Sequence, residues 1–172
     1  MKYIKALIFV ILLTVLDQFT KYLAVVNLKD KPAIPIIQDV FELQYLENRG
    51  SAFGMMQNQR VFFIIITIVI VAAFIWLFTR IPNTRRMIPM NILCTLIIAG
   101  AVGNFIDRLL HGYVVDFLYF KLIDFPIFNV ADIYVTTAAV ALIILGLFYY
   151  KEDDFDILFG KNKKHHTKEH EG

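Results

Sequence analysis

The sequence predicts a membrane all-α fold: a four-transmembrane-helix bundle with a small extracytoplasmic β-sheet and a membrane-surface loop. Hydrophobic residues make up 58% of the chain, above the roughly 45–50% of soluble domains, and the mean hydropathy is +0.62. Four apolar stretches are long enough to cross a bilayer, because about 20 helical residues span the hydrocarbon core. One outer loop also has the alternating pattern of a half-buried strand.

Composition excludes several classes of function and site. The formal net charge of +2 is too small to indicate nucleic-acid binding. The single cysteine, Cys94, excludes an intrachain disulfide framework and a Cys-rich zinc site, and we interpret it as a small buried hydrophobe. His165 and His166 have no further ligand at a suitable spacing, so we expect no metal site.

The first predicted helix covers residues 3–28 and is apolar except for Lys5, Asp17 and Lys21. A cleaved signal peptide is the alternative, but Asp17 follows the apolar run where a small-residue cleavage site would stand, so we expect a retained helix. Asp17 and Lys21 are four residues apart with the acid first, which places them on one helix face. This spacing predicts a self-neutralising pair that locks helices together, with a proton relay as the alternative.

The other three predicted helices, over residues 61–79, 87–106 and 133–150, carry no charge. With the N-terminus inside, ten Lys and Arg residues fall on the cytoplasmic side and six on the other. The positive-inside rule therefore predicts a multi-pass protein of the cytoplasmic membrane with both termini in the cytoplasm. We expect one membrane-embedded domain over residues 1–150 and a solvated cytoplasmic tail over residues 151–172.

Two outer segments, residues 27–60 and 111–132, are longer than ordinary connections, which indicates function. In the first, Phe41, Leu43 and Tyr45 alternate with polar residues and predict a strand of a small sheet. A glycine-punctuated turn over residues 48–54 follows it. The second segment is rich in aromatic residues, as expected of a chain lying in the headgroup zone.

Polar residues also mark the end of the third span. Gly100, Asn104, Asp107 and Arg108 are spaced to lie along one stripe of the helix. Small residues such as Gly103 let another helix approach the stripe closely. Helix packing explains the glycines and Asn104, but it does not explain the two charged residues, so we expect the stripe to have a function.

Asp116 and Asp132 bracket the second outer segment, and each lies among apolar neighbours near a helix end. Two carboxylates at one dry interface share a proton, which is the requirement of aspartic peptide hydrolysis. A proton-coupled transporter and a non-enzymatic scaffold are the alternatives. The transporter predicts repeated halves, which the sequence lacks, and the scaffold leaves the outer polar motifs unexplained.

The polar motifs together resemble those of one enzyme family, the lipoprotein signal peptidases, also called type II or prolipoprotein signal peptidases. The resemblance covers residues 3 to 150, with Ile133 a minor departure. Five motifs in the family's order carry it: Asp17-Gln18-Phe19-Thr20-Lys21, Asn48-x-Gly50-x-Ala52-Phe53, Gly103-Asn104-x-x-Asp107-Arg108, Val114-x-Asp116-Phe117 and Phe128-Asn129-x-Ala131-Asp132.

The resemblance implies a bacterial inner-membrane aspartic endopeptidase that cuts diacylglyceryl-modified prolipoproteins immediately before the lipidated cysteine. It implies that Asp116 and Asp132 activate water near the outer face without a metal or cofactor. It also implies a monomer surrounded by membrane lipids and inhibited by cyclic peptide antibiotics such as globomycin. Asn48, Asn104, Arg108 and Asn129 would bind substrate or orient the dyad, and Asp17, Lys21 and Asp107 would be structural.

Overall fold

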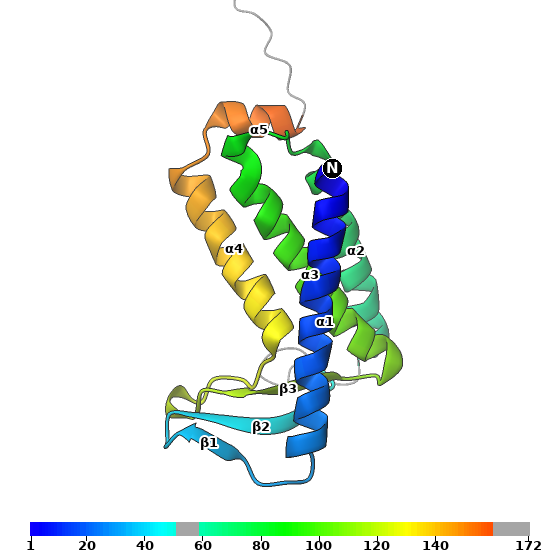
Figure 1. Ribbon diagram of the computed structural model, residues 1–172, viewed down its shortest axis with the longest axis vertical. Helices are drawn as coiled ribbons and strands as arrows, with labels where there is room; N and C mark the ends of the chain where they lie inside the picture. The colour runs from blue at the N-terminus through cyan, green and yellow to red at the C-terminus, as the bar shows by residue number, and fades with distance from the viewer. Residues whose placement is uncertain (51–58, 160–172) are drawn as a thin grey trace, which may run out of the picture.

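The computed structural model describes residues 1–50 and 59–159 of the chain. Four long helices run along one axis of the molecule, a small sheet lies across one end, and a short helix crosses the other (Figure 1). By length and composition the four are able to cross a membrane, which confirms the predicted bundle. They are α1 (Lys2–Leu28), α2 (Arg60–Arg80), α3 (Ile88–Leu110) and α4 (Val130–Phe148).

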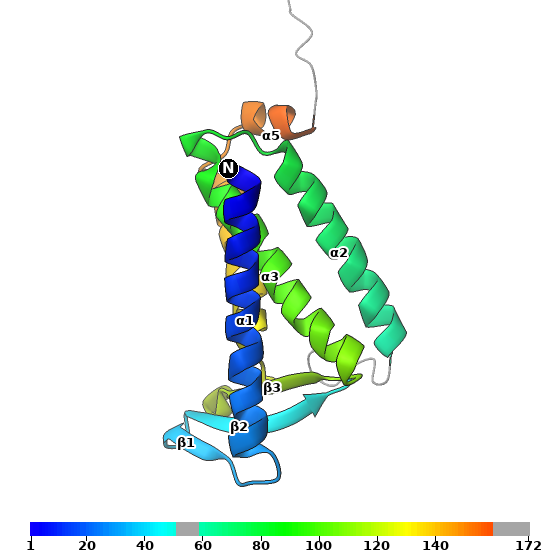
Figure 2. The same cartoon turned by 45° about the vertical axis from the view of Figure 1, so that its right-hand side comes forward.

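Helix α3 is the centre of the bundle and packs against the other three long helices (Figure 2). A short 3₁₀ turn, Arg85–Met87, leads into it, and Pro89 stands in its first turn, where its missing N–H leaves no hydrogen bond unmade. The helix continues four residues beyond the predicted end at residue 106. Asp107 and Arg108 therefore lie inside its last turns.

The sheet has three antiparallel strands in the order β1 (Ile34–Ile37), β2 (Phe41–Asn48) and β3 (Val114–Tyr119). The predicted alternation in β2 is confirmed for Leu43 and Tyr45, which are half-buried on either side of exposed Gln44. The segment predicted to lie on the membrane surface contains β3 and a 3₁₀ turn, Lys121–Ile123. The sequence analysis did not predict β3.

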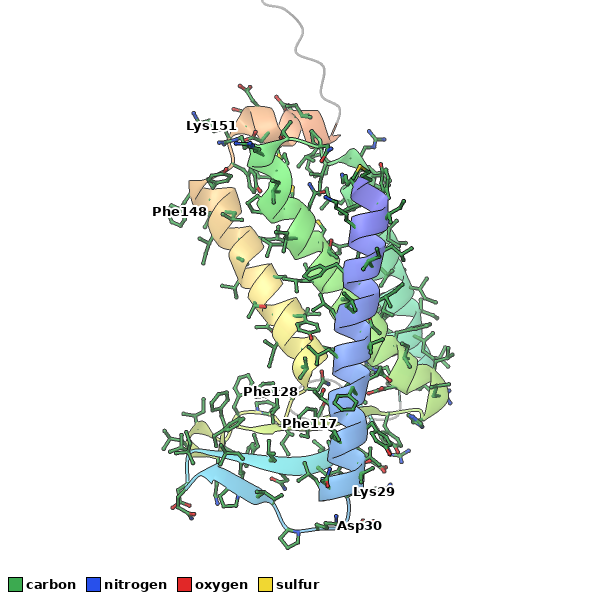
Figure 3. The ribbon with its side chains drawn as sticks, in the orientation of Figure 1. Lys29, Asp30, Phe117, Phe128, Phe148 and Lys151 are labelled. Carbon is green, nitrogen blue, oxygen red and sulfur yellow. The ribbon has the colours of Figure 1, made fainter. Side chains whose placement is uncertain are left out.

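The sheet is attached to the bundle through the last turns of α1. Ala24 and Leu28 of this helix form a buried apolar cluster with Val115 and Phe117 of β3. Figure 3 shows Phe117 and Phe128 where the sheet meets the helices. Because α1 and β3 share a core, the strand that carries Asp116 has a fixed position relative to the helices.

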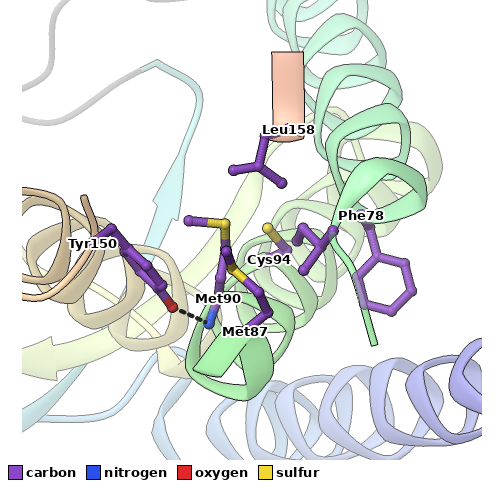
Figure 4. Close-up of a cluster of buried hydrophobic side chains, with 7 residues drawn as sticks. Phe78, Met87, Met90, Cys94, Tyr150 and Leu158 are labelled. Carbon is purple, nitrogen blue, oxygen red and sulfur yellow. Dashed lines mark hydrogen bonds between the residues drawn. The ribbon is translucent and has the colours of Figure 1, made fainter. Parts of the chain in front are cut away.

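Helix α5 (Glu152–Phe159) crosses the end of the bundle opposite the sheet. Leu158 is only 1% exposed and packs into an apolar cluster with Phe78, Met90 and Cys94 (Figure 4). The interpretation of the whole tail as a solvated end is therefore wrong for α5, because its apolar face is buried against the bundle. His165 and His166 lie outside the described residues.

Candidate active site

The two carboxylates predicted to form a dyad come from different elements and line one pocket. Asp116 lies in β3 opposite Leu46 of β2, and Asp132 lies in the first turn of α4. The pocket has a volume of about 450 Å³, and Asn48 and Asn104 line it beside the two acids. The structure thus brings together residues that are 16 positions apart in the sequence.

A capping box fixes Asp132 at the start of α4. The N-cap residue Asn129 accepts a hydrogen bond from the Asp132 backbone N–H at 3.0 Å, and Asp132 Oδ2 accepts one from the Asn129 N–H at 3.1 Å. This reciprocal pattern satisfies two amide donors that the helix start would otherwise leave free. The position of Asp132 therefore follows from local sequence.

Each carboxylate oxygen of the pair accepts one hydrogen bond from the protein. Asp116 Oδ2 accepts from Asn48 Nδ2 at 2.8 Å, and Asp116 Oδ1 accepts from Asn129 Nδ2 at 2.6 Å. Asp132 Oδ1 accepts from Asn104 Nδ2 at 2.7 Å, and the Asn129 N–H serves its other oxygen. Since these partners are all donors, they hold both acids in one orientation.

The orientation of each of these amides is fixed by a donor to its own oxygen. The Gly50 N–H donates to Asn48 Oδ1 at 3.0 Å, and the Asp132 N–H donates to Asn129 Oδ1. Lys21 Nζ donates to Asn104 Oδ1 at 2.8 Å, so the Asn104 NH₂ group faces Asp132. An amide with a donor at its oxygen cannot turn over without losing both bonds. Three asparagines therefore form a rigid set of donors around the dyad.

The predicted pair of Asp17 and Lys21 forms, and Asp107 joins it. Lys21 Nζ lies 2.9 Å from Asp17 Oδ2 and 3.0 Å from Asp107 Oδ2, and all three side chains are at most 3% exposed. The Ala131 N–H donates to Asp17 at 2.9 Å, and the Val115 N–H donates to Asp107 at 3.1 Å. This charged triad ties α1 and α3 to the two segments that carry the dyad.

Glycines on α3 make room for the triad and for α4. A Cβ atom on Gly100 would lie 2.5 Å from the Ala131 carbonyl oxygen, and one on Gly103 would overlap Asp17 Oδ2. The close approach predicted for these small residues is therefore present. It brings the start of α4, with Asp132, against Asn104 of α3.

Asp107 and Arg108 do not share one environment, contrary to the single stripe expected of them. Asp107 faces the buried triad, whereas Arg108 lines the pocket. The Arg108 guanidinium lies over the Phe63 ring at 4.8 Å, and its Nη2 donates to the Gly50 carbonyl at 3.4 Å. Consecutive helical residues point about 100° apart, which separates the two charges.

The electrostatics of the site favour a protonated Asp116. Burial and the nearby charge of Asp132 together raise the pKa of this carboxyl to about 7, against the lowering effect of the hydrogen bonds from Asn48 and Asn129. Desolvation and a neighbouring acid both disfavour a charged carboxylate. Asp116 therefore holds its proton up to about neutral pH, as one member of an acid–base pair must.

An apolar wall that the sequence analysis missed completes the pocket. Phe125, Phe128 and Ile133 contribute to it, and Thr136 and Thr137 extend it along α4. Their aromatic character predicts a place in the headgroup zone, and nothing in their spacing indicates a pocket. No group of three or more His, Cys, Asp or Glu residues within 1–50 and 59–159 is placed to hold a metal ion.

The sequence and the fold match a known family. Residues 9–148 match the family model described as Signal peptidase (SPase) II. The chain belongs to the signal peptidase II family. It is therefore an aspartic peptidase of bacterial type and a multi-pass membrane enzyme, which confirms the resemblance. Ala52 and Phe53 of the second motif lie outside the described residues.

Individual relatives of this signal peptidase II agree with the family match. The lipoprotein signal peptidase of Caldanaerobacter subterraneus subsp. tengcongensis is 44% identical over 144 residues, which cover 83% of this chain and 96% of that protein. The lipoprotein signal peptidase of Brevibacillus brevis is 47% identical over 133 residues, covering 77% and 87%. A solved bacterial membrane enzyme superposes with a TM-score of 0.76 at 34% identity, covering 86% and 92% of the two chains.

Proposed function

We propose that Asp116 and Asp132 are the catalytic pair of this peptidase, and that it cuts diacylglyceryl-modified prolipoproteins immediately before the lipidated cysteine. The observation that carries the proposal is the pocket itself. Both acids line it, and among the described residues each of their oxygens has a single hydrogen-bond donor. A structural ion pair would need a basic partner, and neither acid has one within 4 Å among the described residues.

The proposed reaction uses one water molecule and moves two protons. Asp132 takes a proton from water as the water oxygen attacks the scissile carbonyl carbon, while the Asp116 proton passes to the carbonyl oxygen. The resulting gem-diol collapses when Asp132 returns its proton to the leaving nitrogen and Asp116 recovers the other. Acid and amine are released, and the dyad regains its single shared proton. The reaction forms no covalent intermediate with the enzyme.

The remaining pocket residues receive roles that follow from their contacts. Asn48, Asn104 and Asn129 orient the two acids, as their hydrogen bonds indicate. Arg108 lines the pocket beside them, and its guanidinium is a donor suited to a substrate carbonyl. The apolar wall of Phe125 and Ile133 takes apolar side chains of the signal peptide. The diacylglyceryl group lies in the surrounding bilayer.

The proposal is tested by cleaving a purified prolipoprotein with the purified enzyme in lipid. We expect product masses that place the cut immediately before the diacylglyceryl-cysteine. The same polypeptide without its lipid should be cut at least tenfold more slowly, because the lipid holds the site at membrane level. Equal rates on both substrates would contradict the lipid requirement, and a cut at another bond would contradict the proposed specificity.

We further propose that both termini are cytoplasmic and that the dyad lies near the outer face. The charge count supports this orientation. In whole cells, a membrane-impermeant thiol reagent should label His111→Cys and leave Asn83→Cys unlabelled, since both positions are exposed but lie at opposite ends of α3. The native Cys94 is fully buried and gives no background. Labelling of Asn83→Cys in unbroken cells would reverse the orientation.

A further inference from the structure

The end of the bundle opposite the sheet has a second cavity, also of about 450 Å³, whose walls come mainly from α1 and α3. It is separated from the dyad by most of the length of α3, so it is not part of the peptidase site (Figure 1). Its polar lining residues are Lys2, Lys5, Asn83, Asn91 and Thr95, and its apolar lining residues include Ala6, Phe9 and Ile92.

The polar part carries two positive charges that have no counterion among the residues that the structure describes. Lys2 Nζ donates to the carbonyl oxygens of Phe78 and Ile81 at 2.8 and 2.6 Å, and it lies 4.4 Å from the centre of the Phe78 ring. The Lys5 side chain has no hydrogen-bond or ion-pair partner among residues 1–50 and 59–159, and none of the Asp or Glu residues described there lines the cavity. Cations at membrane level are unfavourable without an anion or water.

The apolar part faces the bilayer. Phe9 is 40% exposed and Ile92 is 45% exposed, and both belong to helices that span the membrane. Water in this part of the cavity would wet apolar side chains, whereas a hydrocarbon chain would bury them. The cavity therefore requires a molecule with an anionic group at one end and a hydrocarbon chain at the other.

We propose that this groove binds one anionic phospholipid, with its phosphate at Lys2 and Lys5 and an acyl chain along Ala6, Phe9 and Ile92. A free phosphate would neutralise the lysines and leave the apolar wall uncovered. A zwitterionic lipid would cover the wall and carry no net charge for the two ammonium groups. The anionic phospholipid meets both conditions, and its binding is independent of the peptidase chemistry.

The test measures the melting temperature of the full-length protein in detergent while phosphatidylglycerol is titrated in. At ten times the half-saturating concentration we expect the midpoint to rise by about 3–6 °C. Phosphatidylcholine with the same chains should require at least fivefold more lipid for the same shift, and glycerol phosphate should give none. Equal shifts with the two lipids, or a full shift with glycerol phosphate, would overturn the proposal.

Two variants localise the effect. Lys5→Gln removes a side chain with no partner in the described structure, so it should fold and should raise the half-saturating phosphatidylglycerol concentration about fivefold. Lys151→Gln is the matched control, because Lys151 lies at the same end of the bundle and outside the groove (Figure 3). The control should bind phosphatidylglycerol as the parent does. Equal weakening in both variants would show diffuse surface attraction and contradict a defined site.

Discussion

The two ends of the bundle are held together by different kinds of interaction. At the sheet end a charged triad of Asp17, Lys21 and Asp107 is buried beside the dyad, next to the small apolar cluster that joins α1 to β3. At the other end the buried residues are apolar, among them Phe78, Met87, Met90, Cys94 and Leu158. Helix α3 contributes to both, so one continuous helix connects a polar core to an apolar one.

This contrast shows where the fold can perform chemistry. Apolar packing is not directional, and a core of this kind tolerates substitutions that conserve volume. Buried hydrogen bonds are directional, and removing one partner leaves the other unsatisfied. The sheet end therefore holds Asn104 and Asp132 in a single arrangement. The opposite end supplies stability without constraining any reacting group.

The largest effect that would test this contrast is expected at the dyad. Asp116→Asn and Asp132→Asn should each lower kcat by about 10²–10⁴-fold, because Asn has a similar volume and cannot transfer the proton. The double variant should be scarcely slower than either single one, since the two acids act as one unit. Substantial turnover by a well-folded single variant would remove that residue from the pair.

The pH profile gives an independent measurement of the same pair. Asp116 has a pKa of about 7, so it loses its proton as the pH rises through that value. If the reaction needs this proton, kcat should fall on the alkaline side of about pH 7 and again at acidic pH when the pair gains a second proton. A rate that stays constant between pH 6 and 9 would contradict the assignment of Asp116 as the acid.

The next largest effect is expected at Lys21. It tests whether this residue only neutralises the buried acids of the triad or also orients Asn104. Lys21→Met should lower the free energy of unfolding by about 3–5 kcal/mol, because Asp17 and Asp107 stay buried without a counterion. Adding Asp17→Asn should recover much of that loss. The double variant should still be slower than the parent, since Asn104 Oδ1 loses the Lys21 donor and keeps the hydrogen bond from Asn129 Nδ2 at 3.1 Å, which holds its NH₂ group less firmly toward Asp132.

Stability and kcat measured on the same samples distinguish these outcomes. Recovery of both by the double variant would show that Lys21 only balances charge. Recovery of stability alone, with an unchanged KM, would show that it positions Asn104.

At the apolar end we expect substitutions to lower the free energy of unfolding without lowering kcat. Leu158→Ala should cost about 2–4 kcal/mol of unfolding free energy, since the side chain is fully buried against α3. Phe159→Ala is the matched control and should change little, because Phe159 is 59% exposed. Below the melting transition both variants should keep the parent kcat. A tenfold lower kcat in Leu158→Ala would show that the two ends are coupled.

The smallest effect is expected at the Arg86–Asp154 ion pair, where the Nη2 to Oδ2 distance is 2.7 Å. Hydrogen bonds from Arg86 hold the pKa of Asp154 below its ordinary value of 3.8. The pair therefore stabilises the protein above about pH 4, and this contribution is lost as the pH falls through the lowered pKa. Asp154→Asn should cost less than about 1 kcal/mol at pH 7, and the difference in melting temperature should shrink as the pH falls through the lowered pKa.

The spans were predictable because their signal is a sum over about 20 residues and does not depend on contacts. Strand β3 was not, because Val114, Val115 and Phe117 are buried on both sides of the sheet and leave no alternation. Strand β1, with the sequence Ile34-Pro35-Ile36-Ile37, likewise lacks an alternation of apolar and polar residues. Helix α5 was missed because its acidic residues suggested a solvated segment.

The motifs predict which residues belong to the candidate site. They do not predict which of these residues contact one another. Asp17 and Lys21 are neighbours on one helix, so their spacing predicts their contact. Asp107 is 86 residues from Lys21, and their contact depends on how α1 and α3 rotate against each other. The hydrogen bond from Lys21 to Asn104, which helps to orient the Asn104 amide, also depends on this rotation. Sequence spacing contains no information on that rotation.

In the proposed mechanism, the capping box at the start of α4 makes the formation of one helical turn a condition for catalysis. Asp132 closes the first helical turn with Asn129, and the same Asn129 side chain donates to Asp116. The dyad therefore exists only when that turn has formed. During refolding, the recovery of peptidase activity should follow the nucleation of this single turn more closely than it follows total helix content. On heating, activity should be lost when the turn frays, before the apolar end of the bundle melts.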